Sequence, residues 1–246
     1  MLMPLVSIML AAAIAPAASG LSPSLHEGDR LDNVFSRTVS FQADGFDETV
    51  RRVSGSASYR VVDATKPALR IDYRYDGIHA GSGAVEFRDA GATQCFDGKC
   101  TANTDGSGLL YNPRLWGTPP GRLEVGQHWT VAIAEPWELG TPGTQTVTVV
   151  AVDTAGHSVT LKREGRGEGA YSGDRLKIDL VRGGKTYAVD VEPGASHWYG
   201  YTTFRDGVVT ADELMVERPV TLVSKELGRI AAKERQFILL NAMPAS

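Results

Sequence analysis

Apolar and polar side chains alternate along most of this chain, which is the pattern of half-buried β-strands. The clearest case is Leu69–Asp76, where every second residue is apolar and each residue between them is charged. A helix would scatter these apolar residues around its circumference. Shorter segments repeat the alternation at Thr38–Ala43, Ser56–Val61 and Leu176–Leu180. The pattern therefore predicts an antiparallel β-protein.

The segment Thr144–Gly165 gives the strongest hairpin signal. β-Branched residues recur at period two until a turn at Asp153–Gly156, after which a second extended segment begins. Alternation places three of its residues on one face of the first strand: Val147, Val149 and Ala151. We take this hairpin as the element around which the rest of the chain is organised.

Glycine-rich and Asp-Gly turns separate about a dozen short predicted strands. They predict an all-β fold, either an antiparallel sandwich or an incompletely closed β-barrel. The sharpest break is Gly117–Gly121, interpreted as an internal crossing in a single β domain over residues 21–246. The alternative is a linker between two β subdomains, 21–116 and 122–246.

The C-terminal segment is ambiguous between helix and strand. A turn at Lys225–Gly228 followed by a closing strand at Phe237–Leu240 is favoured, because Gly228 would cost a helix about 1 kcal/mol. We therefore expect at most one short helix, near the C-terminus.

Composition excludes one class of partner. The 246 residues are 42% hydrophobic and 22% charged, with a formal net charge of −4 and no basic stripe. A nucleic-acid-binding protein normally carries a basic excess, so no nucleic-acid partner is expected.

Residues 1–20 predict a signal peptide. They hold no charged side chain, an apolar run from Leu5 to Ile14, and small residues suited to cleavage after it. The run is too short to cross a bilayer, and no other segment is long and apolar enough. The protein is therefore expected to be exported, periplasmic or extracellular, soluble and not membrane-spanning.

The two cysteines fit an exported protein. Cys95 and Cys100 flank Asp97-Gly98, the favoured pair for a two-residue hairpin turn. Such a turn places the cysteines directly opposite each other, at a separation that a disulfide can span. A metal site would need two more ligands, and a redox pair usually has C-x-x-C spacing. We predict a structural disulfide.

Catalytic and cofactor motifs are not found. Ser82 and Ser107 lie between glycines but lack the spacing of a nucleophile elbow, and the five histidines are dispersed singly. No phosphate or dinucleotide loop occurs, so no catalytic residue, metal or cofactor is predicted. Paired carboxylates are abundant, and Asp212-Glu213, the most visible pair, is expected on a solvated strand edge.

One constellation stands above this background. His197, Tyr199 and Tyr201 fall on one face of an aromatic strand, and Trp198 falls on the other with Thr202 and Phe204. Either one face is core and the other packs under a loop, or one face is an open aromatic platform for a sugar ring, an apolar ligand or a peptide.

A second segment, Lys162–Glu168, alternates in charge and is expected at a solvated strand end. A binding role for Arg163 or Arg166 is the less favoured interpretation.

These patterns favour a non-catalytic binding or envelope-maintenance protein with an aromatic-lined surface. Its partner would be an apolar, glycan or peptide ligand, or another envelope protein. The alternative is a secreted hydrolase that acts on cell-wall glycan or peptide through carboxylates that spacing cannot single out. A third interpretation is a structural module that pairs its edge strands with an envelope protein.

Overall fold

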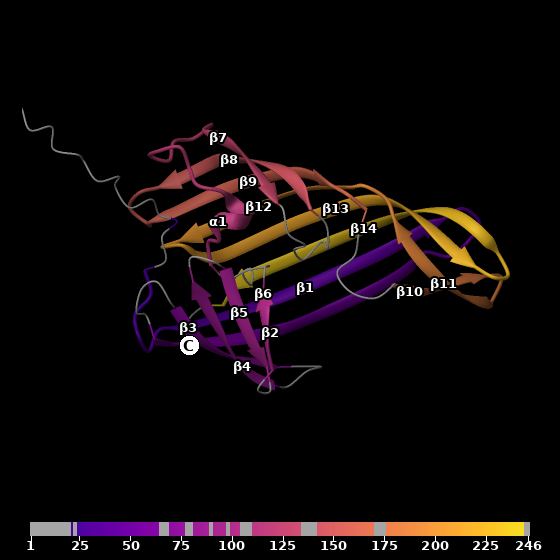
Figure 1. The fold of residues 1–246 in the computed structure, drawn as a ribbon, viewed down its shortest axis with the longest axis horizontal. Coiled ribbons are helices and arrows are strands. Elements are labelled where there is room, and N and C mark those ends of the chain that lie inside the picture. Colours follow the sequence, from indigo (N-terminus) through magenta and orange to yellow (C-terminus); the bar gives the residue numbers. More distant parts are fainter. Residues whose placement is uncertain are drawn as a thin grey trace, which may run out of the picture.

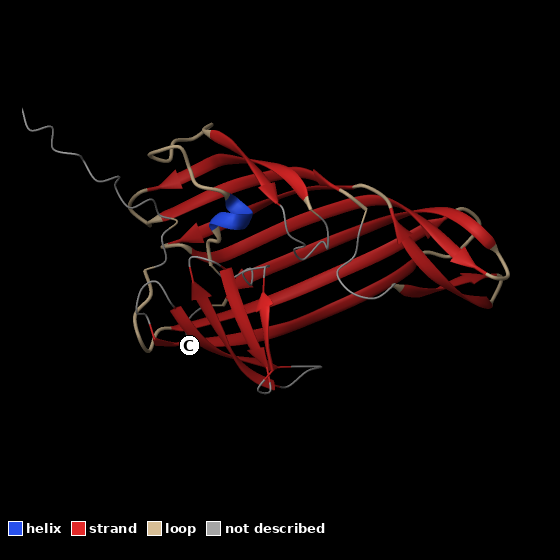
Figure 2. Cartoon of the chain, in the orientation of Figure 1, coloured by secondary structure: helices blue, strands red, loops and turns tan. Residues whose placement is uncertain are grey.

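The computed structural model describes residues 21, 24–63, 69–76, 81–88, 91–96, 99–103, 110–133, 142–169 and 176–243. Nearly all of this backbone is β-strand, as Figure 2 shows, which confirms the predicted all-β antiparallel class. Residues 1–20, with the expected signal peptide, lie outside the described ranges.

Fourteen strands of the described chain form one curled, open antiparallel sheet (Figure 1). The order across the sheet is β6-β5-β4-β3-β2-β1-β14-β13-β12-β9-β8-β7, and the β10–β11 hairpin joins it where β11 pairs with β13. The strands are β1 (Arg30–Ala43), β2 (Thr49–Asp63), β3 (Leu69–Asp76), β4 (Gly81–Arg88), β5 (Gly91–Phe96), β6 (Lys99–Asn103), β7 (His128–Ile133), β8 (Gly143–Asp153), β9 (Ser158–Gly167), β10 (Lys177–Arg182), β11 (Lys185–Pro193), β12 (Ser196–Arg205), β13 (Val208–Ser224) and β14 (Gly228–Ala242).

Within the described ranges there is one helix, α1 (Pro113–Trp116), which lies in the middle of the chain and not near the C-terminus as expected. Asn112 caps it by accepting a hydrogen bond from the Arg114 backbone N–H, and Pro113 fixes the first helical position. The C-terminal segment forms the predicted turn and then strand β14, which begins at Gly228 with φ of 70°. A positive φ is readily adopted only by glycine, which explains the turn there.

The β8–β9 hairpin is present, but its facing pattern changes along β8. The register shifts between Val149 and Ala151, so one extra residue is inserted on β8. Ala151, predicted to face the core with Val149, is exposed instead, while Val152 packs against the core. A β-bulge reverses the alternation, which explains why Val152 is apolar.

Strand β13 is long because it changes partner. It pairs with β12 as far as Glu217 opposite His197, and with β11 from Val220 opposite Pro193 onward. Pro219 lies between the β12 ladder and the β11 ladder. No described strand pairs with β13 there on the β11/β12 side, so the missing N–H of proline costs no ladder hydrogen bond on that side.

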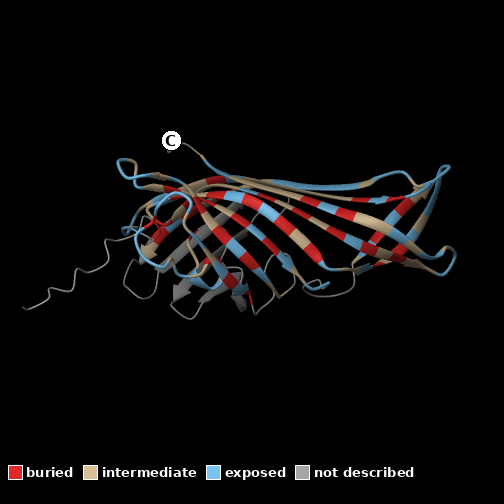
Figure 3. Ribbon diagram, turned by 90° about the horizontal axis from the view of Figure 1, so that it is seen from above, coloured by how far each residue is buried: buried red, intermediate tan, exposed pale blue. Residues whose placement is uncertain are grey.

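The core consists of two apolar clusters on one side of the sheet, and Figure 3 shows buried and exposed residues alternating along the long strands. The first cluster lies beneath α1 and includes Trp116, Trp198 and Phe204. The second, between β1 and the β10–β11 hairpin, includes Phe41 and Leu180. We call this side of the sheet the inner face and the opposite side the outer face.

The indole of Trp198 lies against backbone in the first cluster. A Cβ atom on Gly165, directly opposite Trp198, would stand 2.4 Å from the indole Cζ2 atom, and one on Gly143 would stand 2.7 Å from Cη2. Any side chain at these two positions would displace the ring. The absence of side chains at these two glycines therefore lets the fully buried indole pack directly against the backbone.

The backbone register pairs Cys95 with Cys100 across β5 and β6, as the hairpin prediction requires. Their side chains lie outside the part of the chain that the structure describes, so the disulfide stays a prediction. Both thiols should resist alkylation in denaturant without reductant and react fully after reduction. A Cys95→Ser variant provides the control, since it should expose one reactive thiol. Alkylation of both cysteines in unreduced wild-type protein would disprove the bond.

Candidate functional site

The aromatic strand β12 presents its two tyrosines to solvent. Tyr199 is 40% exposed and Tyr201 is 47% exposed, while His197 lies half-buried on the same outer face. Trp198 belongs to the inner face and is fully buried, so it cannot contact a ligand on the tyrosine side. The structure thus brings together three of the four predicted binding residues and assigns the fourth to the core.

Charged groups of β9 stand beside the tyrosines. Lys162 Nζ donates to Glu164 Oε2 at 3.0 Å, and His197 Nε2 lies 3.7 Å from Glu164 Oε1. The hydrogen bond and the charge of Lys162 hold the pKa of the Glu164 carboxyl below its usual value. At neutral pH, Glu164 is therefore an anion that is already paired within the protein.

A hollow of about 500 Å³ opens next to the tyrosines, over β8 and β9. Short threonine side chains of β8 form much of its lining, and charged groups of β9 form its rim. The residues around it are Thr144, Gln145, Thr146, Thr148, Lys162, Glu164, Gly165, Arg166 and His197. Hydroxyl and charged groups thus line a depression beside two exposed aromatic rings.

On the other side of the tyrosines, apolar side chains continue on the outer face of two further strands, where Glu213 lies among them opposite Tyr201. Met215 on β13 lies directly opposite Tyr199, and Phe237 on β14 lies directly opposite Met215. Met215, Phe237 and the neighbouring Leu239 are half-buried. We call these five residues (Tyr199, Tyr201, Met215, Phe237 and Leu239) the apolar ridge. Large apolar patches on an outer surface commonly mark interaction sites.

Beyond the ridge lies a second hollow, of about 600 Å³, over β14, β1 and β2. Ser36 and Ser54, directly opposite each other, lie at its floor with Ser56, and Val34 and Leu239 form walls. The outer face therefore carries two hollows with short hydroxyl side chains, separated by a ridge of long apolar ones.

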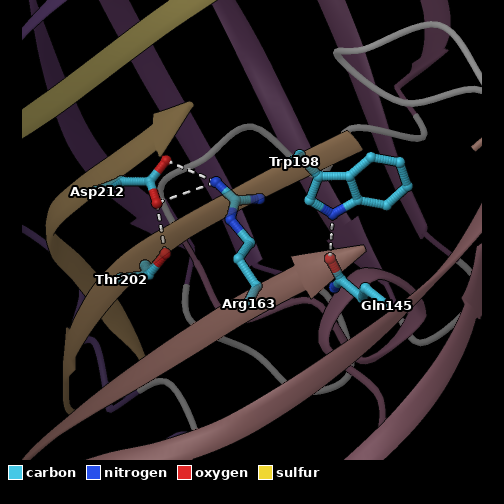
Figure 4. A network of polar contacts seen from close by, with 5 residues as sticks. All are labelled: Gln145, Arg163, Trp198, Thr202 and Asp212. Carbon is cyan, nitrogen blue, oxygen red and sulfur yellow. Dashed lines mark hydrogen bonds and ion pairs between the residues drawn. The ribbon is translucent and has the colours of Figure 1, made fainter. Parts of the chain in front are cut away.

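A buried polar network fixes the strands that carry the tyrosines (Figure 4). Arg163 donates to both carboxylate oxygens of Asp212, at 3.0 and 2.9 Å, and the Thr202 hydroxyl donates to the same carboxylate. The Arg163 and Asp212 side chains are only 3% and 12% exposed. This network joins β9, β12 and β13 from the inner side, directly beneath the tyrosines.

The same network continues toward α1. Trp198 Nε1 donates to Gln145 Oε1 at 3.0 Å, and Gln145 Nε2 donates to the Leu115 carbonyl at 2.6 Å. The Arg163 guanidinium carbon lies 5.0 Å from the centre of the Trp116 ring, within the range of a cation–π contact. Trp198 and Thr202, which alternate with Tyr199 and Tyr201 along β12, are thus both hydrogen-bonded on the inner side of the strand.

These contacts correct two sequence predictions. The Lys162–Glu168 segment runs to the end of β9 and has exposed charges, as predicted, but β9 is an interior strand between β8 and β12 and not a sheet edge. Arg163 is buried. Asp212 and Glu213 do not share a solvated edge, because consecutive strand residues point to opposite faces. Asp212 points inward to Arg163, and Glu213 is exposed on the outer face.

Sequence reasoning also missed the ridge residues of β13 and β14. Met215, Phe237 and Leu239 contact the tyrosine region only through strand pairing. A weak signal was available in Phe237–Leu240, whose continuous apolar run requires apolar groups on both faces of β14.

Other kinds of site find little support in the described ranges. No cluster of three or more His, Cys, Asp or Glu side chains is placed to hold a metal there. Ser82 lies in strand β4 and not in a loop, and Ser107 falls outside the described residues. No helix in the described ranges has the length and hydropathy of a membrane span.

Comparison with protein-family models, with curated proteins and with solved structures finds no match to this chain. The function must therefore be argued from the outer face itself.

Proposed function

We propose that this protein is an exported, non-catalytic binding protein that holds a glycan on the outer face of its sheet. The observation that carries the proposal is the exposed pair Tyr199 and Tyr201 beside a hydroxyl- and charge-rimmed hollow. Aromatic rings with polar tips suit ligands that have one apolar and one polar aspect. Sugar rings have that character, with C–H groups on their faces and hydroxyls at their edges.

Electrostatics favour an uncharged ligand over an ionic one. Lys162 and Glu164 neutralise each other beside Tyr199 and Tyr201. A ligand with a strong charge would have to break this pair, whereas a hydroxyl can donate to Glu164 or accept from Lys162 without doing so. The paired charges beside the tyrosines therefore suit sugar hydroxyls, whereas Arg166 adds a further cation to the lining of the hollow.

The sequence-adjacent pair Asp212-Glu213 gives hydrolysis no support. Asp212 is committed to a buried ion pair with Arg163, and Glu213 lies on the opposite face of the sheet. Glycoside hydrolysis needs two carboxyl groups that flank one bond. Asp212 and Glu213 therefore cannot act together as the two carboxyl groups of a hydrolase, and the exposed tyrosines and the hollow support binding.

Replacing both Tyr199 and Tyr201 with alanine should weaken glycan binding at least tenfold, or about 1.4 kcal/mol. The reason is that central aromatic residues commonly dominate the free energy of a binding surface. Calorimetric titration of wild type and variant against neutral oligosaccharides (cello-, chito-, malto- and xylo-oligosaccharides) provides the measurement.

The matched control is Val50→Ala, which removes an exposed apolar side chain from the same face, away from the tyrosines. This variant should bind as wild type does. If no neutral oligosaccharide binds to the wild-type protein, or if the double alanine variant binds unchanged, the proposed function is wrong.

A further inference from the structure

We infer that the glycan is a linear, uncharged chain that crosses the strands, from the threonine-lined hollow, over the apolar ridge, to the serine-lined hollow. The inference rests on the proposed function and specifies the shape, length and charge of the ligand. Its basis is the way the strand registers align the outer-face residues of seven neighbouring strands.

The registers generate two straight rows across β8, β9, β12, β13, β14, β1 and β2. In each row, every residue is the direct cross-strand partner of the next. The first row is Thr148, Lys162, Tyr201, Glu213, Leu239, Ser36 and Ser54. The second is Thr146, Glu164, Tyr199, Met215, Phe237, Thr38 and Arg52. Both rows run in the same direction, across the strands.

Side-chain size changes in the same order along both rows. Threonines begin each row and small hydroxyl side chains follow on β1. Long side chains occupy the middle, and all of them are apolar or aromatic except Glu213 in the first row. The two hollows coincide with the short side chains, over β8–β9 and over β1–β2. The surface is therefore a continuous track with a ridge at its centre, which fits a chain better than a compact ligand.

The length of the track indicates an oligomer of several sugar rings. Seven strands make six spacings of about 4.8 Å each, so the rows extend roughly 29 Å. A single ring on Tyr199 or Tyr201 would leave both hollows empty. Only a longer chain can use the ridge and the two hollows at once.

The charges along the track argue for an uncharged chain. The first row holds one cation, Lys162, and one carboxylate, Glu213. The second holds Glu164 and Arg52. Each row is thus neutral overall, so a regularly charged polymer would meet a like charge somewhere along either row and lose affinity there.

The test compares short and long ligands on the intact protein. Cello-, chito-, malto- and xylo-oligosaccharides, each as disaccharide and hexasaccharide, are titrated calorimetrically, with an oligogalacturonate hexamer as the anionic chain. The hexasaccharide of at least one neutral series should bind tenfold or more tightly than its disaccharide. The anionic hexamer should bind more weakly than that neutral hexasaccharide.

A substitution in the distant hollow tests the path. Ser54→Trp fills the serine-lined hollow on the far side of the ridge from the first hollow and should weaken hexasaccharide binding about tenfold while disaccharide binding stays unchanged. Thr186→Trp is the matched control, because it adds the same ring at an exposed position of β11, outside the track, and should change neither affinity.

The failures are distinguishable. Equal affinity for disaccharide and hexasaccharide, tighter binding of the anionic hexamer, or an unchanged hexasaccharide affinity in folded Ser54→Trp would each overturn this inference and leave glycan binding at the tyrosines intact. Absence of any neutral binding would instead overturn the proposed function. The chain-length comparison needs only wild-type protein, so it decides the inference even if the substituted hollow impairs folding.

Discussion

Replacing Asp212 with alanine is expected to lower the free energy of unfolding by about 3–5 kcal/mol. The substitution leaves the Arg163 guanidinium buried without the carboxylate that accepts two of its hydrogen bonds. A buried charge that loses its partner keeps its desolvation cost and loses the attraction that offset it. Urea-induced unfolding followed by tryptophan fluorescence measures the effect.

The neighbouring residue supplies the control. Glu213→Ala removes a carboxylate one position along β13, on the exposed face, and should change stability by no more than about 0.5 kcal/mol. Replacing both members of the buried pair, as Arg163→Met with Asp212→Leu, should recover much of the loss, because no charge then remains buried. Equal stability of Asp212→Ala and Glu213→Ala would show that the ion pair does not hold the inner face together.

Replacing Trp198 with alanine is the second large effect, with an expected loss of about 3–5 kcal/mol. The indole is fully buried, and glycines at positions 143 and 165 leave no side chain beneath it that could move into the vacated space. Gln145 Oε1 would also lose the hydrogen bond that it accepts from the indole N–H. Thermal and urea unfolding of the variant provide the measurement.

The adjacent Tyr199→Ala should show the opposite pattern. Tyr199 stands on the exposed face, so its removal should weaken glycan binding and leave the unfolding midpoint close to that of wild type. Trp198→Ala protein that remains folded should keep Tyr199 and Tyr201 exposed on the outer face and should retain part of its affinity for the glycan. If Trp198→Ala is as stable as Tyr199→Ala, the assignment of the inner and outer faces of β12 is wrong.

The facing of β12 could be predicted from sequence because strand geometry alone determines it. Successive side chains of a strand point to opposite sides, so His197, Tyr199 and Tyr201 had to share a face wherever the strand was placed. Alternation could not say which face meets solvent. That depends on α1 and the strands beside it, whose positions follow from packing over long sequence distances.

The buried Arg163–Asp212 pair and the apolar ridge could not be predicted, because both depend on which strands pair. Arg163 and Asp212 are residue types that are mostly exposed, and their burial depends on each being placed opposite the other by strand pairing. The apolar ridge includes Tyr199 on β12 and Phe237 on β14. These two residues lie on the same part of the sheet because β13 lies between their strands and pairs with both. Local patterns carry no information about such non-adjacent partners.

The pairing of β1 with β14 has a consequence for how the chain reaches its native state. Asn33 on β1 lies directly opposite Ala242 on β14, so this edge of an early strand stays unpaired until residue 242 has been synthesised. Contacts between such distant residues form slowly, because a large loop must close first. An unpaired strand edge is also a template for association with other chains. The nascent chain should therefore depend on chaperones until β14 has been synthesised, and chains truncated before β14 should accumulate as aggregates.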